Sequence, residues 1–403
     1  MMEAEVCVDR LLKLISRTRE LFLEDFDRHE RFLLETARKR RFLVIGGAGS
    51  IGQAVVKEIL KREPIAVHVV DLNENNLVEL VRDVRSSTDC IPGDFRTFVV
   101  DCGDLAFEAL YKHEGPYDYV MNLSALKHVR SEKDPYSLMR LVEVNILNVV
   151  KMLNLAASSG VERFFSVSSD KAVNPVSMMG ASKRIMEMLL AQKVEDVPTT
   201  TARFANVAFS DGSLLHGFTM RIRKEQPIAA PRDIKRYFIS PREAGRLCLF
   251  SCLMGDSADV FFPKLSDELK LTSCSDIACE YLRMLGYEPV PCATEDEARR
   301  SVACLIKEQK WPCYFFDSDT TGEKTYEEFF TEDEAPDMER FKDIGVIQNR
   351  STGPNGRLLA FFESVLDLKK RGNWSRQDII ELFMTMVANL QHRDTGKYLD
   401  TRM

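Results

Sequence analysis

Short apolar runs and amphipathic segments alternate along most of the chain. Runs typical of buried strands occur at residues 42–46, 66–71, 97–101, 117–123, 162–168 and 200–208. Helical patterns lie between them at 50–62, 74–85, 104–113, 135–159 and 178–195. Short apolar strands separated by helices predict a parallel sheet with helices on both faces, which is the doubly wound α/β class.

The pattern changes before residue 41 and after residue 209. Residues 5–38 place apolar side chains at helical spacing among charges, which predicts one or two helices packed on the main fold or on a second subunit. Two final helices are expected at about 355–371 and 376–392, the second starting with a capping box at Ser375 and Asp378. Between these ends, we expect helices at 213–225, 241–254, 273–286 and 294–309 and strands at 258–262 and 313–317.

Composition and charge fit a globular protein and narrow the choice of partners. The chain has 403 residues, and its formal net charge of −7 argues against general nucleic-acid binding. The ten cysteines form no CxxC pair and the six histidines do not complete a zinc set, so we expect reduced thiols and no metal. Charges interrupt any N-terminal signal peptide, and no apolar run approaches the length of a membrane span. We expect a soluble, cytoplasmic protein.

A glycine-rich loop follows the first predicted strand and opens the next predicted helix. Glycines 46, 49 and 52 allow a tight turn, close approach of a pyrophosphate and packing of the helix against the strand. The helix that starts at Ser50 and Ile51 would offer free backbone N–H groups to phosphates. In this context the loop predicts a dinucleotide bound to a Rossmann-type sheet.

Two acidic residues end the next strands. Asp71 follows the second strand about 20 residues after the glycines, where a carboxylate binds ribose hydroxyls and repels a 2′-phosphate, so NAD is favoured over NADP. The alternative for Asp71 is a turn residue. Asp101 ends the third strand, where it either reaches the adenine or forms a turn with Gly103.

These features predict four parts of the chain. They are an N-terminal helical extension at 1–40, an NAD-binding Rossmann domain at 41–230, a smaller substrate-binding domain at 231–345 and C-terminal helices at 346–403.

A second group of polar residues follows the strand predicted at 162–168. Ser169, Asp170 and Lys171 stand at its end, and Lys183 lies on the following helix. Open α/β folds place their chemistry at this edge of the sheet. Partial burial of Lys171, with Lys183 nearby, would disfavour its ammonium form and suit it to act as a base. The alternative is a surface ion pair with little energetic weight.

Together, these motifs resemble the nucleotide-sugar 4,6-dehydratases of the extended short-chain dehydrogenase/reductases, which serve bacterial polysaccharide biosynthesis and include enzymes for UDP-N-acetylglucosamine. The resemblance covers about residues 41 to 330. It rests on segments 46–52, 124–129, 169–175, 179–184, 203–207, 236–238 and 322–324.

The resemblance implies that NAD is retained while C4 of a UDP-sugar is oxidised, water is lost across C5 and C6, and the hydride returns to C6. Lys171 would be the C5 base, Asp170 the acid for the C6 hydroxyl, and Ser169 a hydrogen-bonding partner of the C4 oxygen. Cofactor contacts would also come from Ser124, Ala125 and Lys183. Substrate contacts would come from Lys127, His128, Asn206, Arg236, Glu323 and Lys324. Lys127 and His128 are otherwise solvated loop residues, and Arg203 and Arg236 either bind phosphate or pair with nearby acids.

The sequence departs from the resemblance at three positions. Met179 stands where most short-chain dehydrogenases have a tyrosine, and a thioether cannot take a proton. A branch of the dehydratases is similar in having Met there, and the C4 proton would then go to Asp170. Asp211 and Thr320 stand where relatives tend to carry arginine near the substrate phosphates.

The resemblance also implies a homo-oligomer, because the helices predicted at 135–159 and 178–195 commonly form a four-helix interface in this superfamily. Two other functions stay open. One is a nucleotide-sugar C4 epimerase or reductase, against which the Ser169-Asp170-Lys171 set argues, because that chemistry needs no C5 base. The other is a non-catalytic NAD-binding regulator.

Overall fold

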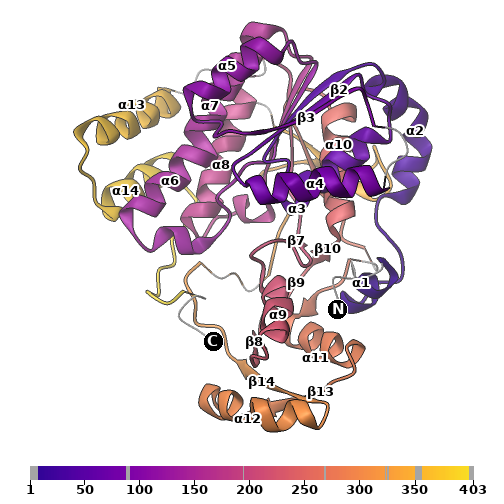
Figure 1. Ribbon diagram of the computed structural model, residues 1–403. Helices are drawn as coiled ribbons and strands as arrows, with labels where there is room; N and C mark the ends of the chain where they lie inside the picture. Colours follow the sequence, from indigo (N-terminus) through magenta and orange to yellow (C-terminus); the bar gives the residue numbers. More distant parts are fainter. Residues whose placement is uncertain are drawn as a thin grey trace.

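A nine-stranded sheet forms the centre of the molecule and confirms the predicted α/β class (Figure 1). The computed structural model describes residues 8–87, 91–193, 195–266, 269–322, 324, 326–349 and 356–398. The strands, in their order across the sheet, are β15 (Pro336–Asp337), β16 (Ile344–Gln348), β11 (Asp259–Pro263), β6 (Thr199–Ala202), β5 (Arg163–Val167), β4 (Tyr119–Asn122), β1 (Arg41–Ile45), β2 (Ala66–Asp71) and β3 (Asp94–Val99).

Helices cover both faces of this sheet because alternate strand residues point to opposite sides. Phe42 and Val44 of β1 contribute to one apolar core, whereas Leu43 and Ile45 contribute to the other. The first core is closed by α3 (Ser50–Leu60), α4 (Glu74–Ser87) and α10 (Pro241–Met254). The second is closed by α5 (Leu105–Glu114), α6 (Pro135–Val142), α7 (Asn148–Ser159) and α8 (Met178–Gln192).

The strand order fixes where a ligand can bind. β1 pairs in parallel with β2 on one side and with β4 on the other, so the chain reverses its direction of progress between β1 and β4. Open α/β sheets bind ligands at such a switch point, outside the carboxyl ends of the strands. The glycine loop and Ser124 follow these two strands.

Two predictions about the sheet are wrong. The run at 200–208 is not one strand, because β6 ends at Ala202 and the chain crosses to pair β7 (Asn206–Val207) with β10 (Phe238–Ile239). The boundary at residue 231 does not separate the sheet either, because β11 pairs with β6 and β16 pairs with β11. An apolar run predicts a strand but not the sheet that the strand joins.

A smaller unit lies below the sheet in Figure 1 and carries its own three-stranded sheet of β13 (Glu288–Cys292), β14 (Lys310–Phe316) and β8 (Ile228–Pro231). Only β14 was predicted. β8 has four residues, and β13 contains Pro289 and Pro291, which are unusual in strands. The other elements here are α9 (Leu214–Arg223), α11 (Cys274–Met284), α12 (Glu295–Lys307) and the short pair β9 (Lys235–Arg236) and β12 (Thr272–Ser273).

The N-terminal helices α1 (Val8–Leu14) and α2 (Leu23–Ala37) pack on the main fold, as one of the two alternatives predicted. Buried polar contacts hold the segment that joins them. The guanidinium of Arg17 pairs with Glu243 of α10, and the backbone N–H of Leu21 donates to the same carboxylate at 2.6 Å. The extension is therefore an integral part of this fold.

The C-terminal helices α13 (Gly356–Arg371) and α14 (Arg376–Met386) cover a surface that was predicted to bind another subunit. Ser375 and Asp378 form the predicted capping box, although α14 ends earlier than residue 392. Side chains of both helices, including Phe361 and Phe383, join the core formed by α6, α7 and α8. Part of the predicted four-helix interface is thus occupied by the chain itself, and the homo-oligomer stays a prediction.

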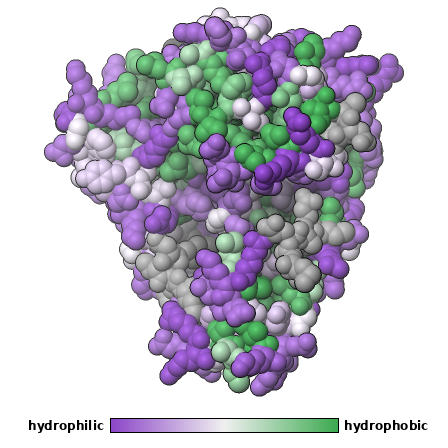
Figure 2. All heavy atoms as spheres, in the orientation of Figure 1, coloured by the Kyte–Doolittle hydropathy of each residue, from purple (hydrophilic) through white to green (hydrophobic). Residues whose placement is uncertain are grey.

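One helical stretch is long and apolar enough to cross a membrane by length and composition. Among the described residues this holds only for Pro135–Ser159, which contains an 18-residue window with a mean hydropathy of 1.3. Arg140, Glu143 and Lys151 interrupt the stretch, so it is not the uninterrupted apolar run whose absence was predicted. More than half of the window is buried inside the protein, which accounts for its apolar character. On the surface in Figure 2, apolar side chains gather on the front of the larger unit.

Candidate active site

The glycine loop has the geometry of a phosphate cradle. Gly46 has a φ of +72°, and a Cβ there would lie 2.6 Å from the backbone nitrogen of Ser124. A Cβ on Gly52 would lie 2.3 Å from the carbonyl oxygen of Gly46. At Gly49 the nearest atom would be 3.6 Å away, and no side chain caps the start of α3 there. The loop therefore leaves an open face with uncapped N–H groups, which fits a pyrophosphate.

We predict that Gly52→Ala destabilises the protein by about 1–3 kcal/mol and lowers its affinity for NAD, because the added methyl meets only backbone and α3 must shift away from the loop. Denaturant unfolding and NAD titration measure the two effects. Gly217→Ala in α9 is the matched control, because a Cβ there meets nothing within 4 Å. An alanine at 217 should leave NAD affinity unchanged. Wild-type NAD affinity in Gly52→Ala would contradict the role assigned to the loop.

The two acidic residues at strand ends differ in their surroundings. Asp71 accepts hydrogen bonds from the backbone N–H of Ala48 in the loop at 3.0 Å and of Asn73 at 2.9 Å. Its carboxylate therefore lies beside the loop, but the bond from Asn73 is also a turn contact, so the ribose role of Asp71 stays a prediction. Asp101 accepts from the N–H of Gly103 and pairs with Arg140 at 2.5 Å, which is the turn alternative.

A break in one helix lies where the loop after β4 meets the start of α8. A π-helical turn at Glu143–Leu147 separates α6 from α7 and contains the buried Asn145. The side-chain oxygen of Asn145 accepts from the backbone N–H of Leu126, and its amide nitrogen donates to the Leu126 carbonyl, each at 2.9 Å. The same amide nitrogen also donates to the Ser182 hydroxyl at 2.9 Å. The loop after β4 and the start of α8 are thus held together.

Lys183 follows Ser182 on α8 and is buried. Its ammonium donates to the carbonyl of Val167, the last residue of β5, at 2.9 Å. Burial lowers the pKa of Lys183 to about 8, with partial compensation from Glu187. The Lys183 ammonium therefore loses its proton more easily than that of an exposed lysine. It lies at the end of β5.

Ser169, Asp170 and Lys171 form a compact group at that strand end, in which Asp170 is buried and the other two are partly exposed. The hydroxyl of Ser169 donates to Asp170 Oδ1 at 2.6 Å and accepts from the Lys171 backbone N–H at 3.0 Å. Lys171 Nζ lies 3.1 Å from Asp170 Oδ1. A Cβ on Gly180 would lie 2.2 Å from the Lys171 carbonyl, so α8 starts in close contact with this turn. Because Asp170 is 2% exposed, the surface ion-pair alternative does not apply.

A buried carboxylate that the sequence did not reveal completes the group. Glu327 lies 3.3 Å from Lys171 Nζ and is close enough to Asp170 for that carboxylate to raise the pKa of Glu327. Asn206 donates to both oxygens of Glu327 at 3.0 Å, and Arg236 Nε lies 3.0 Å from Oε1. Asn206 and Arg236, predicted to contact substrate, thus reach the same cluster through Glu327.

The prediction that Lys171 loses its proton easily is wrong for this arrangement. Burial opposes the ammonium form, but the carboxylates of Asp170 and Glu327 raise the pKa of Lys171 above its ordinary value. Burial and the neighbouring Asp170 raise the pKa of Glu327 to about 8, whereas Lys171 overcomes the effect of burial and lowers the pKa of Asp170. The two carboxyls therefore differ strongly in proton affinity.

Lys127 and His128 line a separate pocket of about 480 Å³ that also contains Ala125, Arg130, Lys133 and Asp211. Both residues are exposed, so the alternative of solvated loop residues stays open. Lys324 Nζ donates to the carbonyl of Val173, and Glu323 lies outside the described residues. The cationic lining at Lys127 suits an anionic ligand next to the loop after β4.

The sequence matches the family described as "Polysaccharide biosynthesis protein" over residues 42–349. The chain belongs to this family. It is 30% identical to an uncharacterised membrane protein of Methanocaldococcus jannaschii over 77% of this chain and 86% of that protein. It is also 30% identical to the probable polysaccharide biosynthesis protein EpsC of Bacillus subtilis, but the match covers 62% of this chain and only 42% of EpsC.

Other relatives of this family member carry different activities in their names. An inverting UDP-N-acetylglucosamine 4,6-dehydratase of Campylobacter jejuni is 27% identical over 58% of this chain and 69% of that protein. A UDP-glucose 4-epimerase of Rickettsia massiliae is 28% identical over 56% of this chain and 66% of its own length.

Two solved structures share the fold. The X-ray structure of Pen from Bacillus thuringiensis has a TM-score of 0.64 at 22% identity and covers 78% of this chain and 89% of that one. UDP-glucuronic acid 4-epimerase from Bacillus cereus, solved with a UDP-sugar and NAD, has a TM-score of 0.53 at 16% identity and covers 71% of this chain and 88% of that one.

Met179, which we predict to stand at the tyrosine position, cannot take part in proton transfer. It lies in the first turn of α8 and is 3% exposed, and its backbone N–H donates to the buried Glu132 at 3.2 Å. Among the carboxyls of the cluster, Asp170 is the one whose pKa is lowered.

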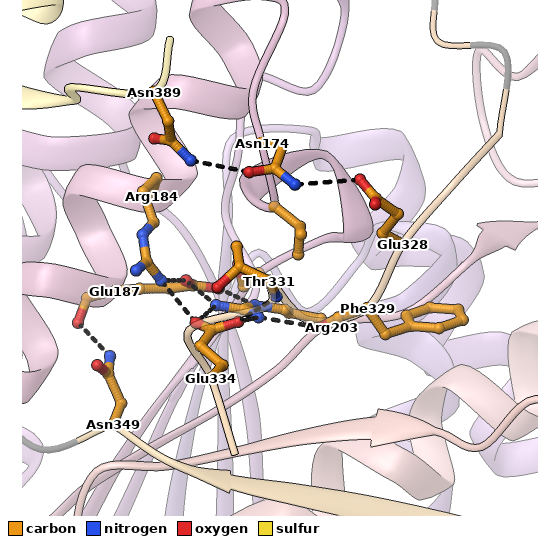
Figure 3. A network of polar contacts seen from close by, with 12 residues as sticks. Asn174, Arg184, Glu187, Arg203, Glu328, Phe329, Thr331, Glu334, Asn349 and Asn389 are labelled. Carbon is orange, nitrogen blue, oxygen red and sulfur yellow. Dashed lines mark hydrogen bonds and ion pairs between the residues drawn. The ribbon is translucent and has the colours of Figure 1, made fainter. Parts of the chain in front are cut away.

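Arg203 is not a phosphate ligand here. Figure 3 shows its guanidinium between Glu187 of α8 and Glu334, with Arg184 beside both acids. Arg203 is fully buried, and it lies 2.7 Å from each of the two carboxylates. Arg203 thus follows the alternative of pairing with nearby acids. The network links segment 329–334 to α8 and to the residues that follow β6.

Proposed function

We propose that this chain is an NAD-dependent 4,6-dehydratase of a UDP-hexose, in the first place UDP-N-acetylglucosamine, and makes the 4-keto-6-deoxy sugar for polysaccharide biosynthesis. The pair of the buried Asp170 and the partly exposed Lys171 at the end of β5, combined with a buried methionine at position 179, is the observation that carries the proposal. An elimination needs both a base at C5 and an acid for the C6 hydroxyl, and this pair offers one of each.

The cradle at Gly46–Gly52 and the carboxylate of Asp71 fit NAD, with Ser50, Ile51, Ser124, Ala125 and Lys183 around it. NAD held there would supply the hydride acceptor for C4 and the hydride donor for C6. Asp170 accepts the C4 hydroxyl proton and passes it to the departing C6 hydroxyl, which leaves as water. Lys171 takes the C5 proton, which the new C4 ketone acidifies, and returns a proton to C5 in the last step.

The cationic pocket at Lys127 supports a diphosphate as the anionic part of the substrate. Its lining by Asp211, where relatives tend to have arginine, reduces the positive charge near that group. We assign Lys127 and His128 to the sugar nucleotide, and Arg236 and Asn206 to the support of the catalytic pair through Glu327.

A C4 epimerase is the second candidate, favoured by the likeness to the Rickettsia massiliae enzyme. Epimerisation uses the same oxidation at C4 but no proton transfer at C5. The base Lys171 and the acid Asp170 would then have no task, and the tyrosine that most short-chain dehydrogenases use is missing. These two features favour the dehydratase.

One experiment separates the candidates. The purified chain is incubated in heavy water with UDP-N-acetylglucosamine, UDP-glucose and UDP-glucuronic acid, and the products are followed by mass and by NMR at C4 and C5. We expect a product lighter by one water that carries deuterium at C5. A product of unchanged mass with inverted C4 would establish the epimerase. Tight NAD binding without turnover of any of the three sugars would establish a non-catalytic regulator.

A further inference from the structure

Glu327 is buried in the candidate site and has no task in the mechanism described so far. It comes from the chain segment between the smaller unit and β15, far from Asp170 in the sequence, and it is 6% exposed. Four groups surround its carboxylate: Asp170, Lys171, Asn206 and Arg236.

The chain on both sides of Glu327 is anchored, so its position is built into the fold. Before it, the Lys324 carbonyl accepts from Arg236 Nη2 at 2.9 Å. After it, the Phe329 carbonyl accepts from the buried Arg203 at 2.9 Å, and the Phe329 ring stacks on Phe262 at 6.1 Å. These contacts leave Glu327 as a fixed member of the cluster.

The proposed dehydratase requires that Lys171 act as a base, yet two carboxylates hold it as an ammonium. The amine becomes available only when a group inside the cluster takes its proton. Two carboxylates are within reach of Lys171 Nζ, Asp170 at 3.1 Å and Glu327 at 3.3 Å.

Asp170 is the poorer acceptor of the two. Its Oδ1 already accepts hydrogen bonds from the Ser169 hydroxyl at 2.6 Å and the Lys171 backbone N–H at 2.9 Å. It must also stay ionised to receive the C4 hydroxyl proton. Glu327 has no such task, and burial next to Asp170 raises its pKa to about 8, closer to that of an amine. Paired carboxyl groups with different proton affinities typically divide acid and base roles.

We propose that Glu327 is a positioning residue that acts through Lys171, receiving one ammonium proton and leaving Lys171 as the neutral amine that attacks the C5 proton. In this step one N–H bond of Lys171 breaks and one O–H bond of Glu327 forms. After Lys171 has returned the C5 proton, Glu327 gives its proton back. This inference rests on the proposed dehydratase function.

The charges of the cluster permit this transfer. With Glu327 ionised, the carboxylates of Asp170 and Glu327 balance the cations of Lys171 and Arg236. After the transfer Asp170 balances Arg236, so these four groups keep a net charge of zero and no unpaired charge is buried. The Asn206 amide donates to both oxygens of Glu327 and can follow the change in its charge.

The test compares Glu327→Gln with the wild-type protein in heavy water, with UDP-N-acetylglucosamine as substrate. Glutamine keeps the size of the side chain but cannot accept the proton. We expect C4 oxidation to persist, seen as accumulation of the reduced nicotinamide absorbance, while C5 deuteration and loss of water fall by at least about a hundredfold. Glu327→Asp, which can still hold a proton, should restore part of the C5 step.

The pH profile provides a second readout. Glu327 must be ionised to accept a proton, so the wild-type C5 step should rise with pH through about 8, and this rise should be absent in Glu327→Gln. The groups that face Glu327 are Asp170, Lys171, Arg236 and Lys324, and Tyr237 lies close enough for Glu327 to raise its pKa. Only Glu327 is changed between the two profiles.

Glu332→Gln is the matched control, because Glu332 is an exposed acid of the same segment and should behave as wild type. Thermal unfolding and NAD titration establish whether each variant is folded. A folded Glu327→Gln protein with wild-type C5 deuteration would overturn the inference. Absence of dehydration by the wild type would instead overturn the proposed function.

Discussion

Replacement of Asp170 by asparagine is expected to lower kcat for dehydration by about 10²–10⁴-fold, the usual contribution of a positioned general acid or base. Asparagine fills the same space but cannot receive the C4 hydroxyl proton or deliver it to the C6 hydroxyl. Because Met179 offers no alternative acceptor, the loss should already affect the oxidation step. Rapid mixing with UDP-N-acetylglucosamine should therefore show little reduced nicotinamide, unlike the result expected for Glu327→Gln.

The control for this variant is Asp317→Asn. Asp317 makes a carboxylate–guanidinium pair with Arg232, but both side chains are more than half exposed, so its loss should change neither activity nor stability measurably. NAD affinity should be close to wild type in both variants, since neither residue touches the glycine loop. Normal dehydration by a folded Asp170→Asn protein would remove Asp170 from the mechanism.

Much of the fold was predictable because its signals are local. Apolar strands, intervening helices and the glycines at 46 and 52 are each recognised from a short stretch of sequence. The observed helices and strands differ from the predicted ones by a few residues at most of their ends. The Ser169-Asp170-Lys171 turn was found for the same reason, since a strand end and a helix start flank it. Each of these features depends on its immediate neighbours in the chain.

The missed features depend on contacts between distant parts of the chain. Glu327 lies 156 residues after Lys171, and nothing distinguishes it in sequence from the exposed acids that follow it. Partial burial and the nearby Lys183 predicted a lowered pKa for Lys171, whereas the carboxylates of Asp170 and Glu327 reverse the sign. The addition of β11 and β16 to the main sheet was missed because strand pairing also depends on contacts between distant parts of the chain.

Arg203→Met is expected to destabilise the protein by about 3–5 kcal/mol, because it leaves Glu187 and Glu334 buried without their main partner. Both acids are ionised in the folded protein. Arg203 overcomes the effect of burial in each case, lowering the pKa of Glu187 and lowering that of Glu334 to about 2. Urea unfolding at neutral pH measures the loss. Arg299→Met on α12 is the control, since its pairs with Glu295 and Asp296 are largely exposed and should contribute about 0–1 kcal/mol.

The pH dependence tests the same network with a defined sign. A folded pKa of about 2 for Glu334 lies below its ordinary value of 4.5, so its stabilising contribution is complete above 4.5 and disappears as the pH falls toward 2. The stability difference between wild type and Arg203→Met should shrink over that interval. Arg203 also anchors Phe329, two residues after Glu327. The variant should therefore lose C5 deuteration even where it remains folded, and a folded variant with full activity would show that Glu327 is held by other contacts.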